Sequence, residues 1–290
     1  MMTVKELLNS TAAALAAGGI AREDAAFEAR CLVEDLAGIG RGRLEAAAGL
    51  PVAPAHIAAV ERAVRERIGG RPLQYILGEW DFLRLRLAVG EGVLIPRPET
   101  ELLCETAVKW LAGRQVRRPR VLDLCAGSGC VGLGIASLYP GATGRDDLQV
   151  TLIEKSPEAL AYLRRNAARY PEGDTTVIPA DILTADPARF GEYDLLVSNP
   201  PYIPASELPD LMPEVRREPA MALDGGEDGL LFYRAIAGRW LPALKPGGCC
   251  AVEVGAGQAE AVMALMAPAL TAISAVKDYS GIDRVVYGVV

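Results

Sequence analysis

Apolar residues recur at helical spacing through the first part of the chain, between residues 3 and 68. Turn-forming glycines and prolines interrupt this pattern near residues 18–19, 38–40 and 51–54, which separates it into several short helices. The positions along one face of the first helix are Val4, Leu7, Leu8, Ala12 and Leu15. The spacing predicts a small, all-helical N-terminal bundle.

Residues 71–98 have a different pattern, in which apolar and polar positions alternate around Gly78. Such alternation around a glycine predicts a β-hairpin. The string Leu-Ile-Pro-Arg-Pro-Glu-Thr-Glu follows at residues 94–101, where two prolines stiffen the loop. Glu99 or Thr100 is expected to open the next helix, which runs through Lys109.

From Arg120 onward, short apolar segments alternate with amphipathic ones, which predicts a mostly parallel sheet covered by helices on both faces. The predicted strands are residues 120–124, 149–154, 175–180, 193–198 and 248–254. The predicted helices lie near residues 129–138, 157–169, 229–243 and 258–268. A final pair at 273–278 and 284–289 has no helix between its members and is expected to form an antiparallel edge hairpin. The whole pattern predicts a helical domain (residues 1–70), a hairpin linker (71–98) and an α/β domain (99–290).

Composition narrows the possible functions. The 30 Lys and Arg residues against 37 Asp and Glu give a net charge of −7, which disfavours a protein that binds nucleic acid through global positive charge. A hydrophobic fraction of 51% excludes a disordered chain. His56 is the only histidine and no Cys-x-x-Cys pair occurs, so the sequence predicts no metal site and no histidine base.

The N-terminal residues, the apolar runs and the cysteines indicate the cellular compartment that we expect for the protein. The first residues lack the features of a secretory signal, and no apolar run reaches the roughly 18 to 20 residues of a membrane span. The six cysteines fit free thiols in a reducing compartment. We therefore expect a cytoplasmic protein that does not enter a membrane.

A candidate cofactor site begins where the first predicted strand of the sheet runs into Gly127-Ser128-Gly129 and then a helix. Glycines allow a ligand to approach the backbone closely, and a helix N-terminus offers unpaired N–H groups. The second strand ends at Glu154, which suits the hydroxyls of a ribose. The third ends at Asp181-Ile182, which suits an adenine ring. Together the three strand ends predict a site for an adenosine-type ligand.

The fourth strand ends in an uncommon string, Asn199-Pro200-Pro201-Tyr202. The prolines have no N–H and hold the preceding residues extended. We expect the Asn199 side-chain oxygen and the Pro200 carbonyl to accept the two hydrogens of a planar NH₂ group while Tyr202 packs on its face. Two fixed acceptors would favour the positive charge that develops on an attacking amide nitrogen, with no general base required before transfer.

With these residues in place, the chain resembles the class I S-adenosylmethionine-dependent methyltransferases that act on planar nitrogens. More specifically, it resembles the release factor glutamine methyltransferases (the HemK/PrmC family). The residues at 71–78, 94–101, 218–234 and 281–284 carry this resemblance, together with Gly127, Glu154 and Asn199 to Tyr202. The resemblance spans essentially the whole chain and implies a seven-stranded, mostly parallel sheet.

The resemblance also implies a reaction and a set of site residues. It implies methylation of the glutamine side-chain nitrogen (N5) in the Gly-Gly-Gln motif of peptide-chain release factors, by S-adenosyl-L-methionine, which becomes S-adenosyl-L-homocysteine. The implied cofactor-binding residues are Asp123, Cys125, Ala126, Gly127, Ser128, Gly129, Glu154, Asp181, Ile182 and Asn199. The implied substrate-binding residues are Asn199, Pro200, Pro201 and Tyr202, with Asn199, Pro200 and Tyr202 catalytic. Many family members have a threonine and an aromatic residue where this chain has Ala126 and Ile182.

Two other substrates remain open. A relative that methylates glutamine on a ribosomal protein would have the same pocket and differ in its docking surface. A nucleic-acid adenine-N6 methyltransferase is disfavoured by net charge and by the lack of a basic target-recognition domain. The arginines at 114, 117, 118 and 120 are interpreted as a solvated linker. An adenosine sensor or a dehydrogenase is disfavoured by the incomplete glycine fingerprint. We expect a monomer that acts on release factors and holds no stable nucleic acid.

Overall fold

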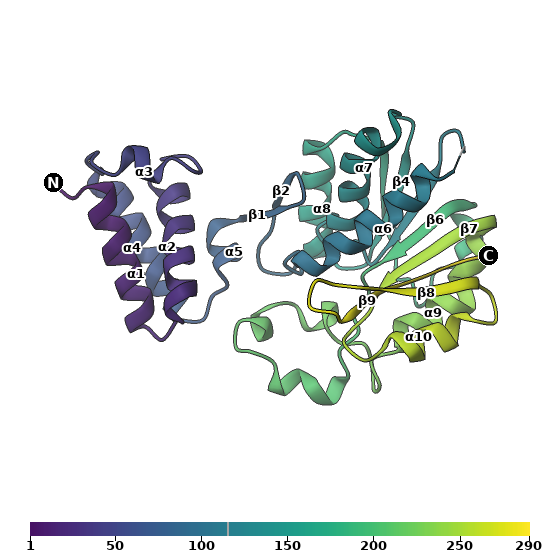
Figure 1. The fold of residues 1–290 in the computed structure, drawn as a ribbon. Coiled ribbons are helices and arrows are strands. Elements are labelled where there is room, and N and C mark those ends of the chain that lie inside the picture. The colour runs from purple at the N-terminus through teal and green to yellow at the C-terminus, as the bar shows by residue number, and fades with distance from the viewer. Residues whose placement is uncertain (115) are drawn as a thin grey trace. The chain divides into compact units, whose positions relative to one another are not determined.

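The computed structural model describes residues 1–114 and 116–290, which divide into two compact units. The first unit comprises Met1–Glu79 together with Met212–Arg217, and the second comprises Trp80–Leu211 and Glu218–Val290 (Figure 1). The sequence did not indicate that a six-residue segment from the later part of the chain joins the N-terminal unit.

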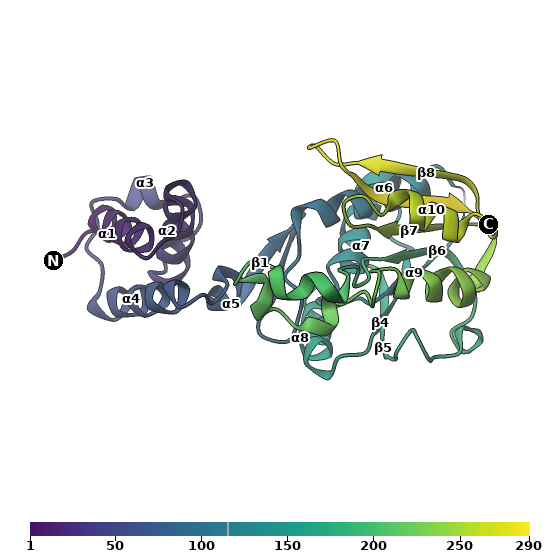
Figure 2. The ribbon, with the colours of Figure 1, turned by 90° about the horizontal axis from the view of Figure 1, so that it is seen from below.

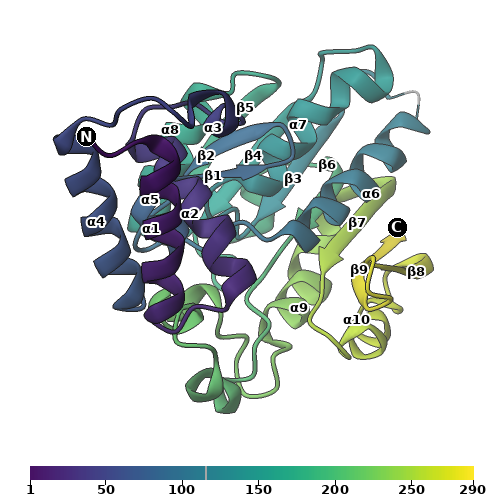
Figure 3. The same ribbon diagram turned by 60° about the vertical axis from the view of Figure 1, so that its left-hand side comes forward.

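The first unit is helical, as predicted. Its helices are α1 (Val4–Ala17), α2 (Arg22–Leu36), α3 (Leu44–Ala47), α4 (Pro54–Ile68) and α5 (Leu73–Leu77). Figure 3 shows α1, α2 and α4 side by side, and their apolar faces bury Leu15, Leu32 and Val60 completely. The Thr3 side chain accepts from the N–H of Glu6 while the Glu6 side chain accepts from the N–H of Thr3, a capping box that fixes the start of α1.

A buried ion pair lies within this unit. Arg67 donates from Nε and a terminal nitrogen to both oxygens of Glu28, over 2.8 and 2.9 Å, and also donates to Glu214 over 2.6 Å. Glu214 belongs to the segment Met212–Arg217, and Arg217 donates to the carbonyl of Gly69. These polar contacts hold the inserted segment in the N-terminal unit.

The second unit is built on a seven-stranded sheet in the order β5-β4-β3-β6-β7-β9-β8, which Figure 2 shows from edge to edge. The strands are β3 (Arg120–Leu124), β4 (Gln149–Glu154), β5 (Asp174–Pro179), β6 (Tyr193–Ser198), β7 (Leu244–Glu253), β8 (Thr271–Lys277) and β9 (Asp283–Val289). Strands β3 to β7 pair in parallel and β9 is antiparallel to both β7 and β8. The predicted mostly parallel sheet and its C-terminal edge hairpin are confirmed.

Side chains alternate between the two faces of this sheet, so each face has its own core. On one face Val121, Val150 and Leu195 pack with α6 (Glu101–Ala112), α7 (Cys130–Thr143) and α8 (Pro157–Arg169). On the other, Leu122 and Leu196 pack with α9 (Leu231–Ala235) and α10 (Ala259–Met266). Because strands β3 to β7 are parallel, their carboxyl ends meet at one shared edge of the sheet.

Two predicted elements differ in detail. Residues 73–77 form the helix α5 rather than a strand, so the hairpin is confined to β1 (Glu79–Phe82) and β2 (Leu85–Ala88). Gly78 ends α5 in the left-handed conformation, the usual helix stop, rather than serving as the centre of a hairpin. Strand β2 is held to α8 because Asn166 and Tyr170 hydrogen bond to the backbone of Ala88 and Arg86.

The predicted helix at residues 229–243 is a composite. Helix α9 continues as a π-helix, Ile236–Trp240, and a 3-10 turn, Leu241–Ala243. Pro242 removes a backbone donor there, which prevents a regular helix from continuing. Short 3-10 segments lie at Pro98–Thr100, Pro187–Arg189, Ala205–Asp210, Val215–Arg217 and Ala220–Ala222.

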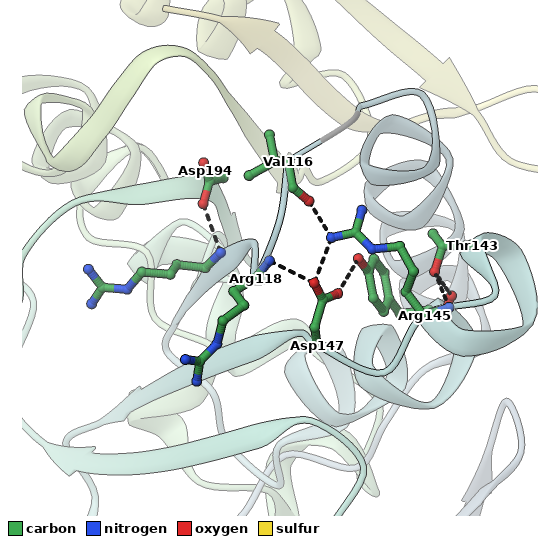
Figure 4. Close-up of polar contacts among 8 residues, drawn as sticks. Val116, Arg118, Thr143, Arg145, Asp147 and Asp194 are labelled. Carbon is green, nitrogen blue, oxygen red and sulfur yellow. Dashed lines mark hydrogen bonds and ion pairs between the residues drawn. The ribbon is translucent and has the colours of Figure 1, made fainter.

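The arginine-rich segment before β3 is anchored by its backbone, and most of its side chains face solvent. In Figure 4, Asp147 accepts from the N–H of Arg118 over 2.8 Å and from the guanidinium of Arg145 over 2.7 Å. These contacts lower the pKa of Asp147 to about 2. Arg114, Arg117 and Arg118 are exposed, which fits a solvated linker.

Across residues 1–114 and 116–290, no helix combines the length and the apolar character that crossing a bilayer demands.

Candidate active site

The turn after β3 has an unusual backbone. Cys125, Gly127 and Gly129 have positive φ angles of 61°, 56° and 85°. Glycine meets this requirement without strain, whereas a cysteine there is uncommon and marks a constrained, functional turn. A Cβ on Gly129 would lie 2.6 Å from Leu163, so this glycine is also needed for packing, while a Cβ on Gly127 would meet nothing within 4 Å. Gly127 therefore leaves open space beside the turn.

Glu154, at the end of β4, holds this turn in place. One of its carboxylate oxygens accepts from the N–H of Gly127 over 2.8 Å, and the other accepts from the N–H groups of Lys155 and Ser156, each over 2.7 Å. A carboxylate oxygen has two lone pairs, so the oxygen that accepts only from Gly127 retains one with which to accept a ligand hydroxyl. The Glu154 side chain borders a cavity that lies over the turn.

That cavity has a volume of about 280 Å³ and is lined by residues of the second unit. Among the sequence-predicted residues it is lined by Cys125, Ala126, Gly127, Ser128, Glu154, Asp181, Ile182, Asn199 and Pro201. Asp123, Gly129, Pro200 and Tyr202 are not part of its lining. The predicted strand-end residues are therefore largely brought together around one hollow.

Asp181 and Ile182 line the cavity beyond Glu154. Burial raises the pKa of Asp181, but hydrogen bonds from Lys155 and the N–H of Leu183 outweigh it, so its pKa is lowered overall. The Lys155 ammonium lies 2.8 Å from the Asp181 carboxylate. Asp181 is thus an ionised acceptor beside the buried, apolar Ile182.

Asp123 lies beneath the turn and has no exposed surface. One of its oxygens accepts from the N–H of Gly132 over 2.9 Å, and the other has no partner among the residues that the structure describes. Burial raises the pKa of Asp123 to about 8. Asp123 therefore stabilises the first turn of α7. It does not line the cavity.

The Asn199-Pro200-Pro201-Tyr202 segment follows β6 at the same edge of the sheet. Asn199 and Pro201 line the cavity, whereas Pro200 is buried. The Asn199 Nδ2 donates to the hydroxyl of Thr100 over 3.1 Å. The Tyr202 ring packs partly into the second core, and burial raises its pKa to about 12, so the phenol is neutral at physiological pH.

A glycine-rich segment fixes the backbone of this motif from the other side. Ile203 exchanges backbone hydrogen bonds with Leu223 and Gly225. A Cβ on Gly225 would lie 2.7 Å from the Tyr202 backbone, and one on Gly229 would lie 2.4 Å from the Tyr202 carbonyl. Both glycines therefore permit an approach that any larger residue would block.

The proline-rich string near residue 96 forms another wall of the cavity, through Leu94, Pro96 and Arg97. The Glu218 carboxylate accepts from the N–H of Ile95 over 3.0 Å and pairs with Arg97. Two motifs separated by about 120 residues in the sequence are joined in this way.

Sequence reasoning missed two buried residues, Thr100 and Glu253. Thr100, expected only to open a helix, makes no capping hydrogen bond with its side chain; it lines the cavity and accepts from Asn199. Glu253 ends β7. Burial raises the pKa of Glu253 to about 7. The available signal was that β7 ends in a carboxylate at the same sheet edge as Glu154 and Asn199.

The lining of the cavity has the chemistry that S-adenosylmethionine requires. The Ser128 hydroxyl lines it and is buried without a hydrogen-bond partner in the described part of the chain, as expected of a group that awaits a ligand. The turn offers open space at Gly127, Glu154 offers acceptors and Ile182 offers an apolar wall. The residues present fit an adenosine-containing ligand with a polar tail.

Residues 6–78 match a family model described as "PrmC N-terminal domain", and residues 73–232 match one described as "Conserved hypothetical protein 95". The release factor glutamine methyltransferase of Geobacter sulfurreducens is 39% identical over 288 residues, covering 99% of this chain and 96% of the relative. That of Bordetella pertussis is 40% identical over 260 residues, covering 89% and 93%.

A solved structure resembles the fold. The hMettl16 catalytic domain, crystallised with the MAT2A 3′UTR hairpin 1, aligns with a TM-score of 0.53 over 96% of this chain and 90% of that chain. Its sequence identity to this chain is 14%. At this identity the likeness concerns the arrangement of strands and helices alone.

Proposed function

Because the chain belongs to the release factor glutamine methyltransferase family, we propose that it methylates the side-chain nitrogen (N5) of the glutamine in the Gly-Gly-Gln motif of peptide-chain release factors. The second unit has the class I methyltransferase fold. The observation that carries the proposal is that Asn199 and the turn held by Glu154 line one cavity.

S-adenosylmethionine supplies an electrophilic methyl group on a sulfonium centre. In our proposal Cys125 to Gly129 surround its amino-acid end, with the Ser128 hydroxyl as a donor or acceptor, and Glu154 accepts from the ribose hydroxyls. Asp181 and Ile182 bind the adenine, Asp181 through its ionised carboxylate. Asp123 acts from beneath, by holding the first turn of α7 through Gly132.

Asn199 and Pro200 then orient the substrate amide. The Asn199 Nδ2 is committed to Thr100, so its oxygen is the atom free to accept from the glutamine NH₂. The Pro200 carbonyl accepts the second hydrogen, Pro201 lines the cavity, and Tyr202 is proposed to pack on the face of the bound amide. A bound S-adenosylmethionine would supply the methyl group to the nitrogen and leave as S-adenosylhomocysteine, and the nitrogen would release one proton to water. Two fixed acceptors stabilise the positive charge that develops on the nitrogen.

The N-terminal unit is proposed to dock the release factor. Its match to the "PrmC N-terminal domain" model supports this role. Action as a monomer, in the cytoplasm and without bound nucleic acid, remains a prediction; the free cysteines of the described chain fit a reducing compartment.

Mass spectrometry of a bacterial release factor after incubation with this protein and S-adenosylmethionine tests the proposal. One added methyl group on the Gly-Gly-Gln peptide is the expected result. A release factor that remains unmodified, while the cofactor binds, would overturn the substrate assignment and direct the same assay to ribosomal proteins.

A further inference from the structure

Two apolar residues that follow the catalytic motif in the chain border the cavity. Met221 and Leu231 both line it, yet 49% and 42% of their surfaces are exposed to solvent. Because both residues line the cavity and face solvent, they lie at its mouth. Two large apolar side chains exposed together at a binding cavity mark a surface that a bound partner covers.

Met221 lies in the 3-10 turn Ala220–Ala222, and the acid that precedes this turn fixes its start. The Glu218 carboxylate accepts from the N–H of Ile95 over 3.0 Å and pairs with Arg97. Glu218 is 5% exposed, so water competes little with these contacts. The turn is thereby attached to the proline-rich string that forms another wall of the cavity.

The end of the turn is attached to the catalytic motif. The Leu223 carbonyl accepts from the N–H of Ile203 over 2.9 Å, and the N–H of Gly225 donates to the Ile203 carbonyl over 2.8 Å. The Gly225 carbonyl accepts from the N–H of Leu231 over 3.0 Å. Ile203 directly follows Tyr202 in the chain. Both apolar residues are therefore held in register with the motif proposed to orient the glutamine amide.

We propose that Met221 and Leu231 form an apolar rim on which the main chain of the release factor lies beside its target glutamine, and that Met221 selects glycine before that glutamine. This inference rests on the proposed function, because it takes a glutamine to enter the cavity. A peptide chain that inserts its glutamine toward Asn199 must pass the mouth of the cavity, where the apolar rim lies.

The preference for glycine follows from the shape of methionine and from the fixed turn. An unbranched side chain with a polarisable sulfur packs closely against a flat peptide main chain. A side chain on the residue before the glutamine would separate the main chain from Met221. The turn cannot follow, because its contacts through Glu218 and Ile203 hold both ends. Glycine adds no side chain, so the contact is kept.

The contacts of the apolar rim also separate it from the cofactor residues. Within residues 1–114 and 116–290, the hydrogen bonds that hold it lead to Ile95 and Ile203, and none of them leads to Glu154 or Asp181. We therefore expect Met221 to contribute to substrate binding and not to cofactor affinity.

Met221→Ala and Met221→Leu form a matched pair, with Val290→Ala as the control. Val290 is an exposed apolar residue of the same unit that does not line the cavity. Met221→Ala should raise KM for a release factor about fivefold, with kcat nearly unchanged, since a partly covered methionine loses its contact. Met221→Leu keeps the apolar volume and should stay within about twofold of the wild type. Equal KM values for Met221→Ala and Val290→Ala would overturn the proposal.

Substrate variants test the selection of glycine. The wild type should methylate a release factor with Gly-Ala-Gln about tenfold less efficiently, in kcat/KM, than one with Gly-Gly-Gln, the effect of one added carbon in a fixed site. Met221→Ala should reduce this ratio to about threefold, because the added methyl group occupies the space vacated. Any effect of alanine on the substrate backbone itself enters both ratios and cancels. The same ratio in both enzymes would contradict the selective role of Met221.

A binding measurement separates this inference from the proposed function. The chain has six methionines, so ¹³C-methyl methionine labelling gives a simple spectrum in which Met221→Leu identifies the Met221 signal. Addition of a release factor should shift that signal, whereas the signal of the buried Met266 should stay in place. If no methyl group is transferred, the proposed function fails, while a shift still supports the apolar rim. An unmoved Met221 signal, or a cofactor affinity lowered in Met221→Ala by calorimetry, would overturn the inference.

Discussion

The two units bury carboxyl groups in opposite ways. In the N-terminal unit, both oxygens of Glu28 accept from Arg67, which also pairs with Glu214. In the methyltransferase unit, Glu253 is as deeply buried but has one oxygen without a partner in the described chain. Its charged neighbours Arg97 and Arg284 act at a distance and only partly offset the effect of burial on its pKa.

The difference separates structural from functional polar groups. A buried charge removed from water is tolerated when its partner satisfies it, and the pair then stays ionised and maintains one packing arrangement. A buried carboxyl with an unsatisfied oxygen destabilises the fold and titrates near neutral pH. The first arrangement belongs to the helical N-terminal unit, whereas the second lies at the end of β7 in the methyltransferase unit. Four experiments test this contrast.

The largest effect is expected for Arg67→Met. This variant leaves Glu28 buried and uncompensated, which should lower the free energy of unfolding by about 3 to 5 kcal/mol. The double variant Glu28→Leu/Arg67→Met should recover much of that loss. Urea unfolding measures both, with Arg30→Met, which breaks an exposed ion pair with Glu45, as the control. An Arg67→Met protein as stable as the Arg30→Met control would break the comparison.

Asn199→Ala tests the functional side. We expect a loss of about 2.7 to 4 kcal/mol of transition-state stabilisation, since one oriented acceptor is removed from the charge that develops on the nitrogen. Single-turnover methylation of a release factor measures the rate, and calorimetry should find the cofactor affinity nearly intact. Near-normal turnover would exclude the role proposed for Asn199.

Glu253→Gln changes stability. The folded-state pKa of Glu253, about 7, lies above its ordinary value of 4.5, so the folded protein binds the proton more tightly than the unfolded chain. The stability this proton contributes is complete below pH 4.5 and is lost as the pH rises through about 7. The free energy of unfolding of the wild type, relative to that of Glu253→Gln, should therefore fall by on the order of 3 kcal/mol between pH 4.5 and 8.

Urea unfolding of both proteins across this pH range measures the change. Asp123 is present in both proteins, so its titration does not contribute to the difference between their free energies of unfolding. Glu192→Gln, an exposed position just before β6, should follow the wild-type curve. Parallel curves for the wild type and Glu253→Gln would show that the carboxyl is satisfied after all.

The smallest effect is expected for Glu154→Ala, which should weaken cofactor binding by about 1.5 to 3 kcal/mol, the range for hydrogen bonds to a charged group. Glu154 also holds the N–H of Gly127, so the turn itself loosens. Calorimetric titration with S-adenosylmethionine measures the affinity, and Glu192→Ala serves as the remote control. Unchanged affinity would remove Glu154 from the ribose site.

Periodicity predicted much of the second unit because the sheet is regular. Each parallel strand is a short apolar run whose carboxyl end meets the same edge, so Gly127, Glu154 and Asn199 were expected together and line one cavity. The composite helix after Leu230 was not predicted, because Pro242 and the π-turn break the period. The short helix α5 was missed, because five residues are too few to distinguish a helical repeat of hydrophobic positions from the alternation of a strand.

By itself, the sequence determined the layered α/β architecture, the glycine turn and the polar strand ends, since these depend on local spacing and backbone chemistry. Only the tertiary structure decided what surrounds them. Thr100 meets Asn199 across 99 residues, and Arg67 meets Glu214 across 147. Such pairings carry no local signature, because the free energy of a buried polar group depends on which distant partners the fold places beside it.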